Sequence, residues 1–585
     1  MRTRRGRRWL ELCRDVALVS PGMFFVEYLV SGIYGVSLAA TPLFLERVFD
    51  GVSAFAVGKI SLEKMLLPIL GLFGLMILSE IAAGASDYLG ETYADLTSQK
   101  LFYQINRKIG KLSAIDFEKP QVLNQINKAY QGAFSSRDLV HTFMDLLTMY
   151  LPYFIFYGWY LYQCRPLLPL ALVLIFVPVV LSQIVKGKLY AKQEDVSAPL
   201  RRKKDAFASY VSTKEYAKET RGHGAVPIFC RKFSSAQEEL NKCLKKTETQ
   251  ICKADVIALM LNMAGYFGVL VLLLGSVLGG HIRVSAFVAV FSSIRTAYEQ
   301  LEEIFGDRAG AISAATAKVK NYLAFLELPC EERGQTEEAP VCSIDAENVS
   351  FQYPDGTQAL RGITFHAERG QMIAVVGENG SGKTTLSKLL AGLYEPSAGK
   401  LLYNGQERKP PAIRLQTSQM FQQYNRYHMT LGQNIAIGRE LRPAGEEAWA
   451  AIDGAGLPLT TDRFPDGLET MLGLTFGGIE LSGGQWQRIA LARAIYRPCQ
   501  VLILDEPTAA IDPVEETALY RTFQECCRGR IGFVVTHRTG MVKICQQVIV
   551  MRQGSIVDCG THEELLLRCE YYHRLWHAQA DQYAC

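Results

Sequence analysis

The chain has 585 residues, which is enough for at least two domains. Hydrophobic residues make up 49% of the chain and charged residues only 21%, and this apolar composition argues against a wholly soluble protein of this size. The net charge of +4 at pH 7 is small and gives no indication of a nucleic-acid partner.

The N-terminal residues, MRTRRGRRWLELC, are basic. No short apolar core with a small-residue cleavage site follows them, so we expect that no signal peptide is removed.

The N-terminal half of the chain contains long apolar runs, and three ionisable residues lie in or near them: Glu27, Glu80 and Arg295. Ionisable residues in membrane spans are candidates for function, and we take Glu80 as the best single candidate for substrate contact. Glu27 and Arg295 could instead reach the membrane interface from helix ends.

Six apolar runs follow the basic N-terminus. A helix needs about 20 mostly apolar residues to cross a bilayer, and five of the runs meet or approach this length while the sixth is shorter. Buried helices of a large soluble protein are the alternative, but core helices of this length are rarely uncharged on all sides. We predict membrane spans at residues 22–45, 64–86, 142–164, 166–186, 255–279 and 284–305.

The segments between the apolar runs alternate in length. Asp87–His141 and Lys186–Lys253 are long, and the second is rich in Lys and Arg, whereas the other connections are short. Six crossings would place the basic N-terminus and both long segments on one side of the membrane, and positive charge collects on the cytoplasmic side. The cysteines have no metal-type spacing, so we expect free thiols in a reducing compartment, in agreement with this orientation.

The composition and hydropathy pattern of the sequence change near residue 326. Residues 326–340 are acidic, contain Pro and lack periodicity, which predicts a linker between a membrane domain at 1–325 and a second domain at 341–585. In the second domain short β-rich runs alternate with helical patterns, as in a parallel α/β sheet.

A glycine-rich stretch, GENGSGKT at Gly377–Thr384, follows the apolar run MIAVV and precedes a helical pattern. This strand–loop–helix context is typical of a phosphate-binding loop and makes a chance glycine-rich turn a weak alternative. Backbone N–H groups and the helix N-terminus would face the phosphates, Lys383 would reach the outer phosphates, and Thr384 would hold Mg²⁺. We expect ATP to be bound here by Gly377, Asn379, Gly380, Ser381, Gly382, Lys383, Thr384 and Thr385.

Two consecutive carboxylates, Asp505 and Glu506, follow the apolar run VLIL. At the end of a buried strand, Asp505 would hold Mg²⁺ through water and Glu506 would polarise an attacking water. Such a pair is common by itself, but together with a phosphate-binding loop it indicates an ATPase. The fold class we expect is therefore an all-α six-helix membrane domain joined to an α/β P-loop NTPase domain.

A third motif, LSGGQ at Leu481–Gln485, precedes Asp505 by one helix-length segment. With the two motifs above, the sequence resembles the nucleotide-binding domain of ATP-binding cassette (ABC) transporters, and the resemblance covers nearly the whole chain. In that family two domains pair head to tail and sandwich two ATP molecules, each between the phosphate loop of one domain and the LSGGQ motif of the other. The resemblance thus implies that a second copy's ATP is contacted by Ser482, Gly483, Gly484 and Gln485.

Four further positions carry the same resemblance. Tyr353 is similar to the family's aromatic residue that stacks on adenine, a contact that needs only a flat ring. Gln422 is similar to the glutamine that senses Mg²⁺, and His537 to the histidine that contacts the γ-phosphate. Asp512 lies in Ala-Ile-Asp, where the family's dimer-contact loop is usually Ala-Leu-Asp.

The membrane half, with six spans before the ATPase, resembles half-size ABC exporters. The resemblance implies that the two long segments form long cytosolic helical extensions. The resemblance implies an interfacial helix near Trp9–Val16 and coupling helices near Asp116–Leu123 and Arg221–Phe229. All catalytic elements are intact, which favours a homodimer with two working sites, although a heterodimer with a degraded partner remains open.

We therefore expect an ATP- and Mg²⁺-dependent transporter in the cytoplasmic (inner) membrane, with its N-terminus and ATPase domain in the cytosol. It would export an amphipathic peptide, lipid or drug by alternating access. Import of metal-chelating compounds remains an alternative, because some chains of this architecture import. A soluble ATPase acting on nucleic acid is opposed by the apolar runs and the single phosphate loop, and a membrane-tethered ATP-binding regulator remains a third alternative.

Overall fold

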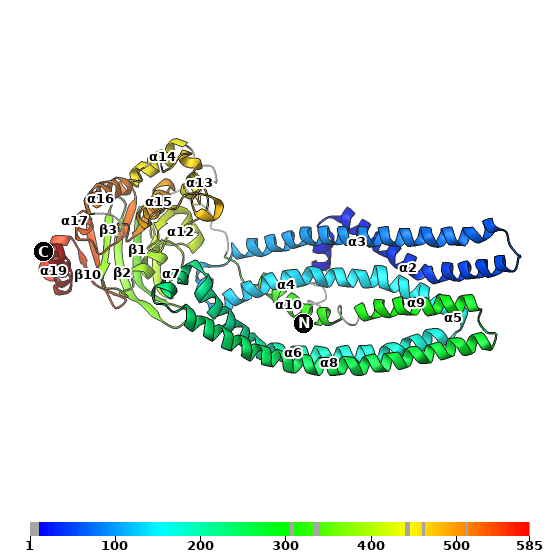
Figure 1. Cartoon of the computed structure of the whole chain (residues 1–585). Helices are drawn as coiled ribbons and strands as arrows, with labels where there is room; N and C mark the ends of the chain where they lie inside the picture. The colour runs from blue at the N-terminus through cyan, green and yellow to red at the C-terminus, as the bar shows by residue number, and fades with distance from the viewer. Residues whose placement is uncertain are drawn as a thin grey trace. The chain divides into compact units, whose positions relative to one another are not determined.

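The structure is a computed structural model, and it describes residues 11–304, 309–331, 340–438, 445–458, 463–508 and 513–583. The chain divides into two compact units, which we describe separately (Figure 1). The helical unit comprises Met1–Arg107 and Gln125–Glu327, and the sheet unit comprises Lys108–Asn124 and Leu328–Cys585.

The helical unit is built from long helices. Those with described bounds are α2 (Pro21–Ala56), α3 (Leu62–Ile109), α4 (Pro120–Asp145), α5 (Leu151–Cys164), α6 (Leu167–Ser212), α7 (Lys214–Gly222), α8 (Val226–Leu278), α9 (Val284–Glu302) and α10 (Ala309–Leu326). A π-helical turn at Leu146–Tyr150 joins α4 to α5. The 53-residue helix α8 is about 80 Å long at 1.5 Å per residue, more than twice the thickness of a bilayer core. The unit therefore has long helical extensions beyond any membrane.

Four helical stretches among the described residues are long and apolar enough to cross a membrane: Pro21–Ala56, Leu62–Ile109, Pro120–Cys164 and Val226–Leu278. In the apolar window of Leu62–Ile109 only 6% of the residues are buried within the structure. Such outward-facing apolar side chains are typical of lipid contact and not of the core of a soluble protein. The spans predicted at 166–186 and 284–305 coincide largely with α6 and α9, and as membrane spans they stay predictions.

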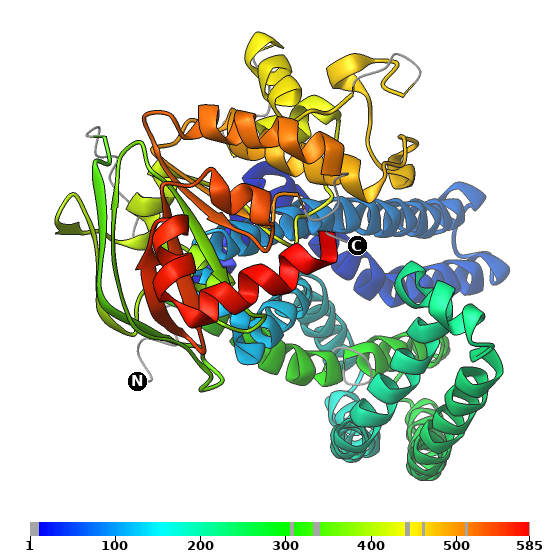
Figure 2. The ribbon, with the colours of Figure 1, turned by 90° about the vertical axis from the view of Figure 1, so that its left-hand side faces the viewer.

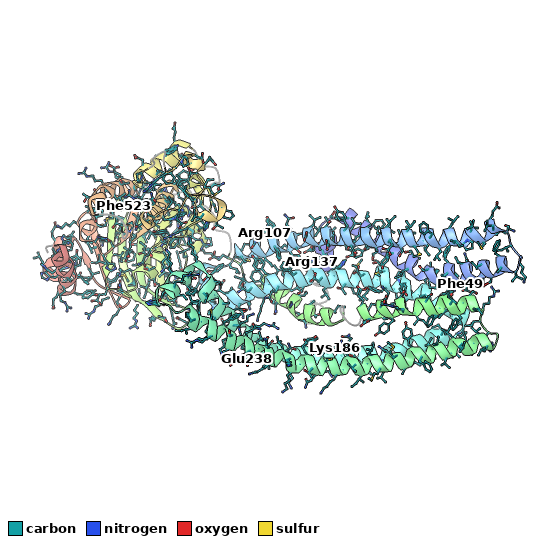
Figure 3. All side chains as sticks on the ribbon, viewed as in Figure 1. Phe49, Arg107, Arg137, Lys186, Glu238 and Phe523 are labelled. Atoms are coloured by element: carbon teal, nitrogen blue, oxygen red, sulfur yellow. The ribbon has the colours of Figure 1, made fainter. Side chains whose placement is uncertain are left out.

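Close helix contacts and ion pairs hold the helical unit together. A side chain at Gly132 of α4 would overlap the backbone of α10 at Lys318, so this position needs glycine. Helices α6 and α8 lie side by side, and Lys186 of α6 forms an ion pair with Asp255 of α8 at 2.6 Å (Figures 1 and 3). Glu238 is exposed on α8 and forms an ion pair with Lys242 at 2.9 Å (Figure 3).

The sheet unit contains two sheets. The first is antiparallel, in the order β2-β1-β4-β5, and the second has the order β10-β9-β3-β8-β7-β6 with only β10 antiparallel. The strands are β1 (Ser343–Gln352), β2 (Gln358–Glu368), β3 (Met372–Gly377), β4 (Ala398–Tyr403), β5 (Gln406–Glu407), β6 (Thr417–Met420), β7 (Val501–Asp505), β8 (Ile531–Val535), β9 (Gln547–Arg552) and β10 (Ser555–Gly560). The predicted α/β domain with a parallel sheet is confirmed.

Helices cover the second sheet on both faces (Figure 2). Those with described bounds are α11 (Lys383–Leu390), α12 (Pro410–Gln416), α13 (Leu431–Ala436), α14 (Gly445–Gly454), α15 (Gly483–Tyr496), α16 (Pro513–Cys527), α17 (Thr539–Lys543), α18 (His562–Arg568) and α19 (Glu570–Tyr583). Strands β3, β7 and β8 are buried along their whole length, which explains their continuous apolar runs. Phe523 of α16 is fully buried within this unit (Figure 3).

The segment Lys108–Asn124 belongs to the sheet unit, although it lies within the range predicted for the membrane domain. Its 3₁₀ helix η1 (Ala114–Glu118) packs Ala114 and Ile115 against the apolar core between β1, β2 and α11. Hydropathy does not show this, because the contact joins residues more than 200 positions apart.

Candidate nucleotide-binding site

The phosphate-binding loop connects β3 to α11, as the sequence motif predicts. Gly377 has φ of 153° and Gly382 has φ of 102°, which other residues rarely adopt. A side chain at Gly377 would also overlap the carbonyl oxygen of Met551. The glycines are thus required for the turn, which leaves Asn379 and Gly380 exposed at its tip.

Lys383 opens α11 and turns back into the loop. Its Nζ donates hydrogen bonds to the carbonyl oxygens of Gly377 and Glu378, both at 2.8 Å, and its side chain is almost fully buried. Burial lowers the pKa of Lys383, while Glu506 and Asp505 oppose this shift. The buried hydroxyl of Ser381 has no hydrogen-bond partner among the described residues. A buried amino group and an unsatisfied hydroxyl in one glycine-rich loop fit a phosphate group.

Asp505 lies at the carboxyl end of β7, beside the phosphate-binding loop. Burial raises the pKa of Asp505 to about 6, and a hydrogen bond from Thr384 opposes the shift. The hydroxyl of Ser387 lies 3.5 Å from Asp505 Oδ2. This oxygen set fits Mg²⁺, which is usually held by one or two protein ligands plus phosphate oxygens and water. No group of three or more His, Cys, Asp or Glu suited to a metal occurs among the described residues, so the phosphates would have to complete the site.

Glu506 has φ of 50°, a left-handed conformation that is uncommon for glutamate. Its carboxylate lies between two polar side chains, with Gln422 Nε2 at 3.1 Å from Oε2 and His537 Nε2 at 3.3 Å from Oε1. Burial and the nearby charge of Lys383 lower the pKa of His537, and the Glu506 carboxylate opposes this shift. The structure thus brings together Gln422, Glu506 and His537 from three separate parts of the sequence.

Gln487 is a neighbour of this group that the motifs did not single out. Its side chain is buried and its Nε2 donates to the backbone oxygen of Glu506 at 3.1 Å. Together with the hydrogen bond from Glu506 N to Val535 O, it fixes the backbone that carries the carboxylate. The only sequence signal was a glutamine on the buried face of the helix after LSGGQ.

The LSGGQ motif forms the start of α15. Ser482 is the N-cap, and its hydroxyl accepts from Gln485 N while the Gln485 side chain accepts from Ser482 N, which is a capping box. Ser482 and Gly483 are exposed, and Gly484 is half-buried. An exposed N-terminus of a 14-residue helix is suited to an anion.

Two further residues were predicted to make contacts, Tyr353 with adenine and Asp512 with a second copy of the chain. Tyr353 is half-buried, lies edge-on to Phe351 with ring centroids 5.0 Å apart, and places its hydroxyl 3.0 Å from Thr385 Oγ1. It therefore lies beside the helix that follows the phosphate-binding loop. Asp512 lies outside the described residues.

Comparisons with known proteins agree with this geometry. Residues 360–509 match the ABC transporter family. The subtilin transport ATP-binding protein of Bacillus subtilis is 28% identical over 86% of this chain and 83% of its own length. Over the whole fold, a bacterial Atm1-family ABC exporter with ATP bound superposes with a TM-score of 0.76 at 22% identity, covering 94% of this chain and 98% of that one. The chain thus carries an ABC transporter domain and has the fold of a half-size ABC exporter.

Other relatives match a smaller share of this chain. The ATP-dependent lipid A-core flippase of Chromohalobacter salexigens is 32% identical over 62% of this chain and 63% of its own length. The predictions of family and fold class are confirmed. An ABC transporter domain implies ATP binding and ATP hydrolysis coupled to transport, and the long apolar helices indicate a membrane protein. The roles of the individual site residues stay predictions.

Proposed function

We propose that this ABC transporter uses ATP and Mg²⁺ to export an amphipathic substrate across the cytoplasmic membrane, as a homodimer with its ATPase domains in the cytosol. The observation that carries the proposal is the position of Glu506, held between Gln422 and His537 beside the phosphate-binding loop. This arrangement contains a base, a polar partner and a phosphate cradle, which hydrolysis requires.

In the proposed reaction Lys383, Ser381 and the loop N–H groups bind the phosphates. Thr384 and Asp505 would hold Mg²⁺, which would supply positive charge against the phosphates. Glu506 orients a water and accepts its proton, and His537 donates a hydrogen bond toward the γ-phosphate. Gln422 contacts the Glu506 carboxylate and would keep it aimed at the water.

The second half of each site would come from a second copy. The exposed N-terminus of α15, with Ser482 and Gly483, suits the γ-phosphate of ATP bound to the partner. ATP would then join the two domains, and hydrolysis would release them. The two resulting states are the inward- and outward-facing conformations that alternating access requires.

The relatives support the direction and the class of substrate. One is named for subtilin transport and another as a lipid A-core flippase, and the superposed structure is named an exporter. Import with the same fold is the alternative. Inside-out vesicles distinguish the two, because export predicts ATP-dependent accumulation inside them and import predicts none.

The test of the proposed catalysis is Glu506→Gln in the full chain, reconstituted in lipid. Because the amide cannot accept a proton, we expect ATPase activity to fall at least 100-fold, about 3 kcal/mol of activation free energy, while ATP stays bound. Glu525→Gln, which removes an exposed carboxylate from α16 of the same unit, should leave activity unchanged. Near wild-type hydrolysis by Glu506→Gln would contradict the assignment.

A further inference from the structure

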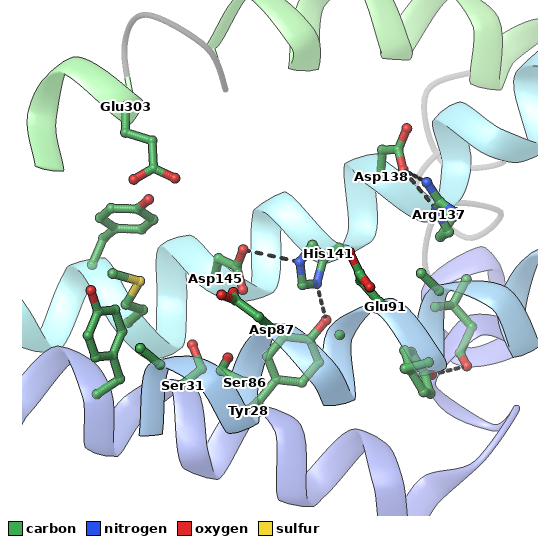
Figure 4. Close-up of a pocket in the computed structure, with 18 of the residues that line it drawn as sticks. Tyr28, Ser31, Ser86, Asp87, Glu91, Arg137, Asp138, His141, Asp145 and Glu303 are labelled. Carbon is green, nitrogen blue, oxygen red and sulfur yellow. Dashed lines mark hydrogen bonds and ion pairs between the residues drawn. The ribbon is translucent and has the colours of Figure 1, made fainter. Parts of the chain in front are cut away.

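A cavity of about 510 Å³ lies within the helical unit, among α2, α3, α4 and the end of α9 (Figure 4). No step of the ATPase reaction involves it. Its volume suits part of a small organic molecule.

The wall of the cavity is strongly acidic. Asp87 and Glu91 lie one turn apart on α3, and Asp138 and Asp145 lie on one face of α4 (Figure 4). With Glu303, five carboxylates line the cavity, against one guanidinium, Arg137, which is already hydrogen-bonded to Asp138 at 2.8 Å. An anionic ligand would be repelled by this wall, and a cationic ligand would be attracted.

A sixth carboxylate, Glu27, lies directly behind this wall and supplies an independent observation. Its side chain is only 1% exposed, and neither carboxylate oxygen has a hydrogen-bond partner among the described residues. Oε1 lies 3.2 Å from Nδ1 of His141 and 3.3 Å from where a Cβ on Gly90 would be. His141 and Gly90 both line the cavity, and Gly90 places no side chain in front of Glu27. A buried carboxylate without a hydrogen bond is stabilised by positive charge, which His141 supplies only when it is protonated.

His141 connects Glu27 to the rest of the wall. Its Nδ1 is 3.2 Å from the hydroxyl of Tyr28, and its Nε2 is 3.4 Å from Asp145 Oδ2 (Figure 4). The imidazole therefore lies between two carboxylates, one behind the wall and one on it.

Aromatic and apolar groups share the cavity with the carboxylates. Tyr28, Tyr34, Tyr93 and Tyr150 all line it, together with apolar residues such as Met149. Aromatic faces attract organic cations. A bare metal ion fits less well, because no group of three or more metal-type ligands occurs among the described residues.

We propose that this cavity is a binding site for amphipathic organic cations, whose ammonium, phosphonium or guanidinium group lies against the acidic wall and whose apolar part lies against the tyrosines. The inference rests on the proposed transport function and gives it a substrate class: the exported molecule is cationic.

The test compares tetraphenylphosphonium with tetraphenylborate, two ions of nearly the same shape and opposite charge. Their binding to the full chain in nanodiscs of zwitterionic lipid is measured without ATP, and binding to empty nanodiscs is subtracted. We expect saturable binding of the cation and none of the anion. The double variant Asp87→Asn/Glu91→Gln should weaken cation binding at least tenfold, because it removes two charges from the site. Glu27→Gln should weaken it also.

The matched control is Asp95→Asn, which removes an exposed carboxylate from the same helix outside the cavity wall and should bind the cation like wild type. Asp87→Glu/Glu91→Asp, which keeps both charges, should also retain binding. Equal binding of both ions, or an unchanged affinity in the neutral double variant, would overturn the inference. Since binding is measured without ATP, its failure is separate from the proposed function, which fails if Glu506→Gln still hydrolyses ATP.

Discussion

The position of the Glu506 carboxylate depends on a few individual neighbouring residues. Its left-handed backbone, with φ of 50°, is maintained by hydrogen bonds to Val535 and from Gln487, and its carboxylate has Gln422 and His537 as neighbours. Strain of this kind persists only where surrounding contacts fix it, and it is concentrated at functional sites.

The buried amino group of Lys383 is expected to contribute to ATP affinity. Lys383→Ala removes the buried amino group that donates to the loop, so we expect ATP affinity to fall at least tenfold, about 1.4 kcal/mol or more. Titration with a fluorescent ATP analogue in the Glu506→Gln background measures this without hydrolysis. Lys400→Ala, at an exposed position of β4, is the control. Equal affinity in both variants would show that Lys383 does not contact the nucleotide.

The interactions of His366 on β2 make the free energy of unfolding depend on pH. Hydrogen bonds to Asp345, at 2.5 Å, and to Glu368 raise the pKa of His366. The interactions of protonated His366 therefore contribute fully to the free energy of unfolding below about pH 6.5, the pKa of histidine in the unfolded chain. This contribution is lost as pH rises through the raised pKa of the folded state. Because the ring is exposed, we expect His366→Gln to lower the unfolding free energy by about 0.5 kcal/mol or less at pH 6 and not at pH 9. Denaturant unfolding at both pH values tests this, and a larger effect at pH 9 contradicts it.

At the scale of elements, η1 is linked to the phosphate-binding loop. Glu118 at its end accepts a hydrogen bond from the hydroxyl of Tyr394, and lies 3.5 Å from Nζ of Lys388. Lys388 is in the last turn of α11, the helix that Lys383 opens. A displacement of η1 would therefore act on the helix that holds the phosphates.

The contact between Glu118 and Tyr394 can be measured by a double-mutant cycle. We expect Glu118→Gln and Tyr394→Phe each to destabilise the sheet unit, with a coupling energy of about 1–2 kcal/mol, because the hydrogen bond involves a charged group. Denaturant unfolding of the full chain in detergent provides the values. Glu395→Gln, at the neighbouring exposed position, is the control. Additive effects of the two changes would exclude a direct contact.

Sequence reasoning was most informative where function depends on adjacent residues. The phosphate-binding loop, the Asp505-Glu506 pair and LSGGQ are each contiguous, so they could be recognised without a structure. The expected coupling segment Asp116–Leu123 overlaps η1 and the start of α4, and Arg221–Phe229 spans the turn between α7 and α8.

Contacts between distant residues could not be predicted in this way. Hydropathy gives the length of a membrane helix but not the face that lines a cavity. Glu80 is exposed and is not among the residues that line the acidic cavity, and its role as a substrate contact stays a prediction. Glu27 is buried beside the cavity wall. The predicted interfacial helix at Trp9–Val16 is only partly described, and residues 11–17 are helical.

In the intact transporter, we propose that ATP lies between two copies of the sheet unit. Each copy has a phosphate-binding loop with a buried, unsatisfied hydroxyl at Ser381 and, separately, an exposed helix N-terminus at Ser482. Joining the two across a dimer would complete two equal sites, and the resulting closure would move the membrane helices.

The most direct measurement is inter-subunit photo-cross-linking. A benzoylphenylalanine is placed at Glu480, an exposed position next to LSGGQ, in the Glu506→Gln background with two differently tagged copies. With ATP and Mg²⁺, mass spectrometry should find cross-links between subunits to the peptide containing Gly377–Thr384, and few without nucleotide. Cross-links confined to one subunit, or equal in both conditions, would contradict the account.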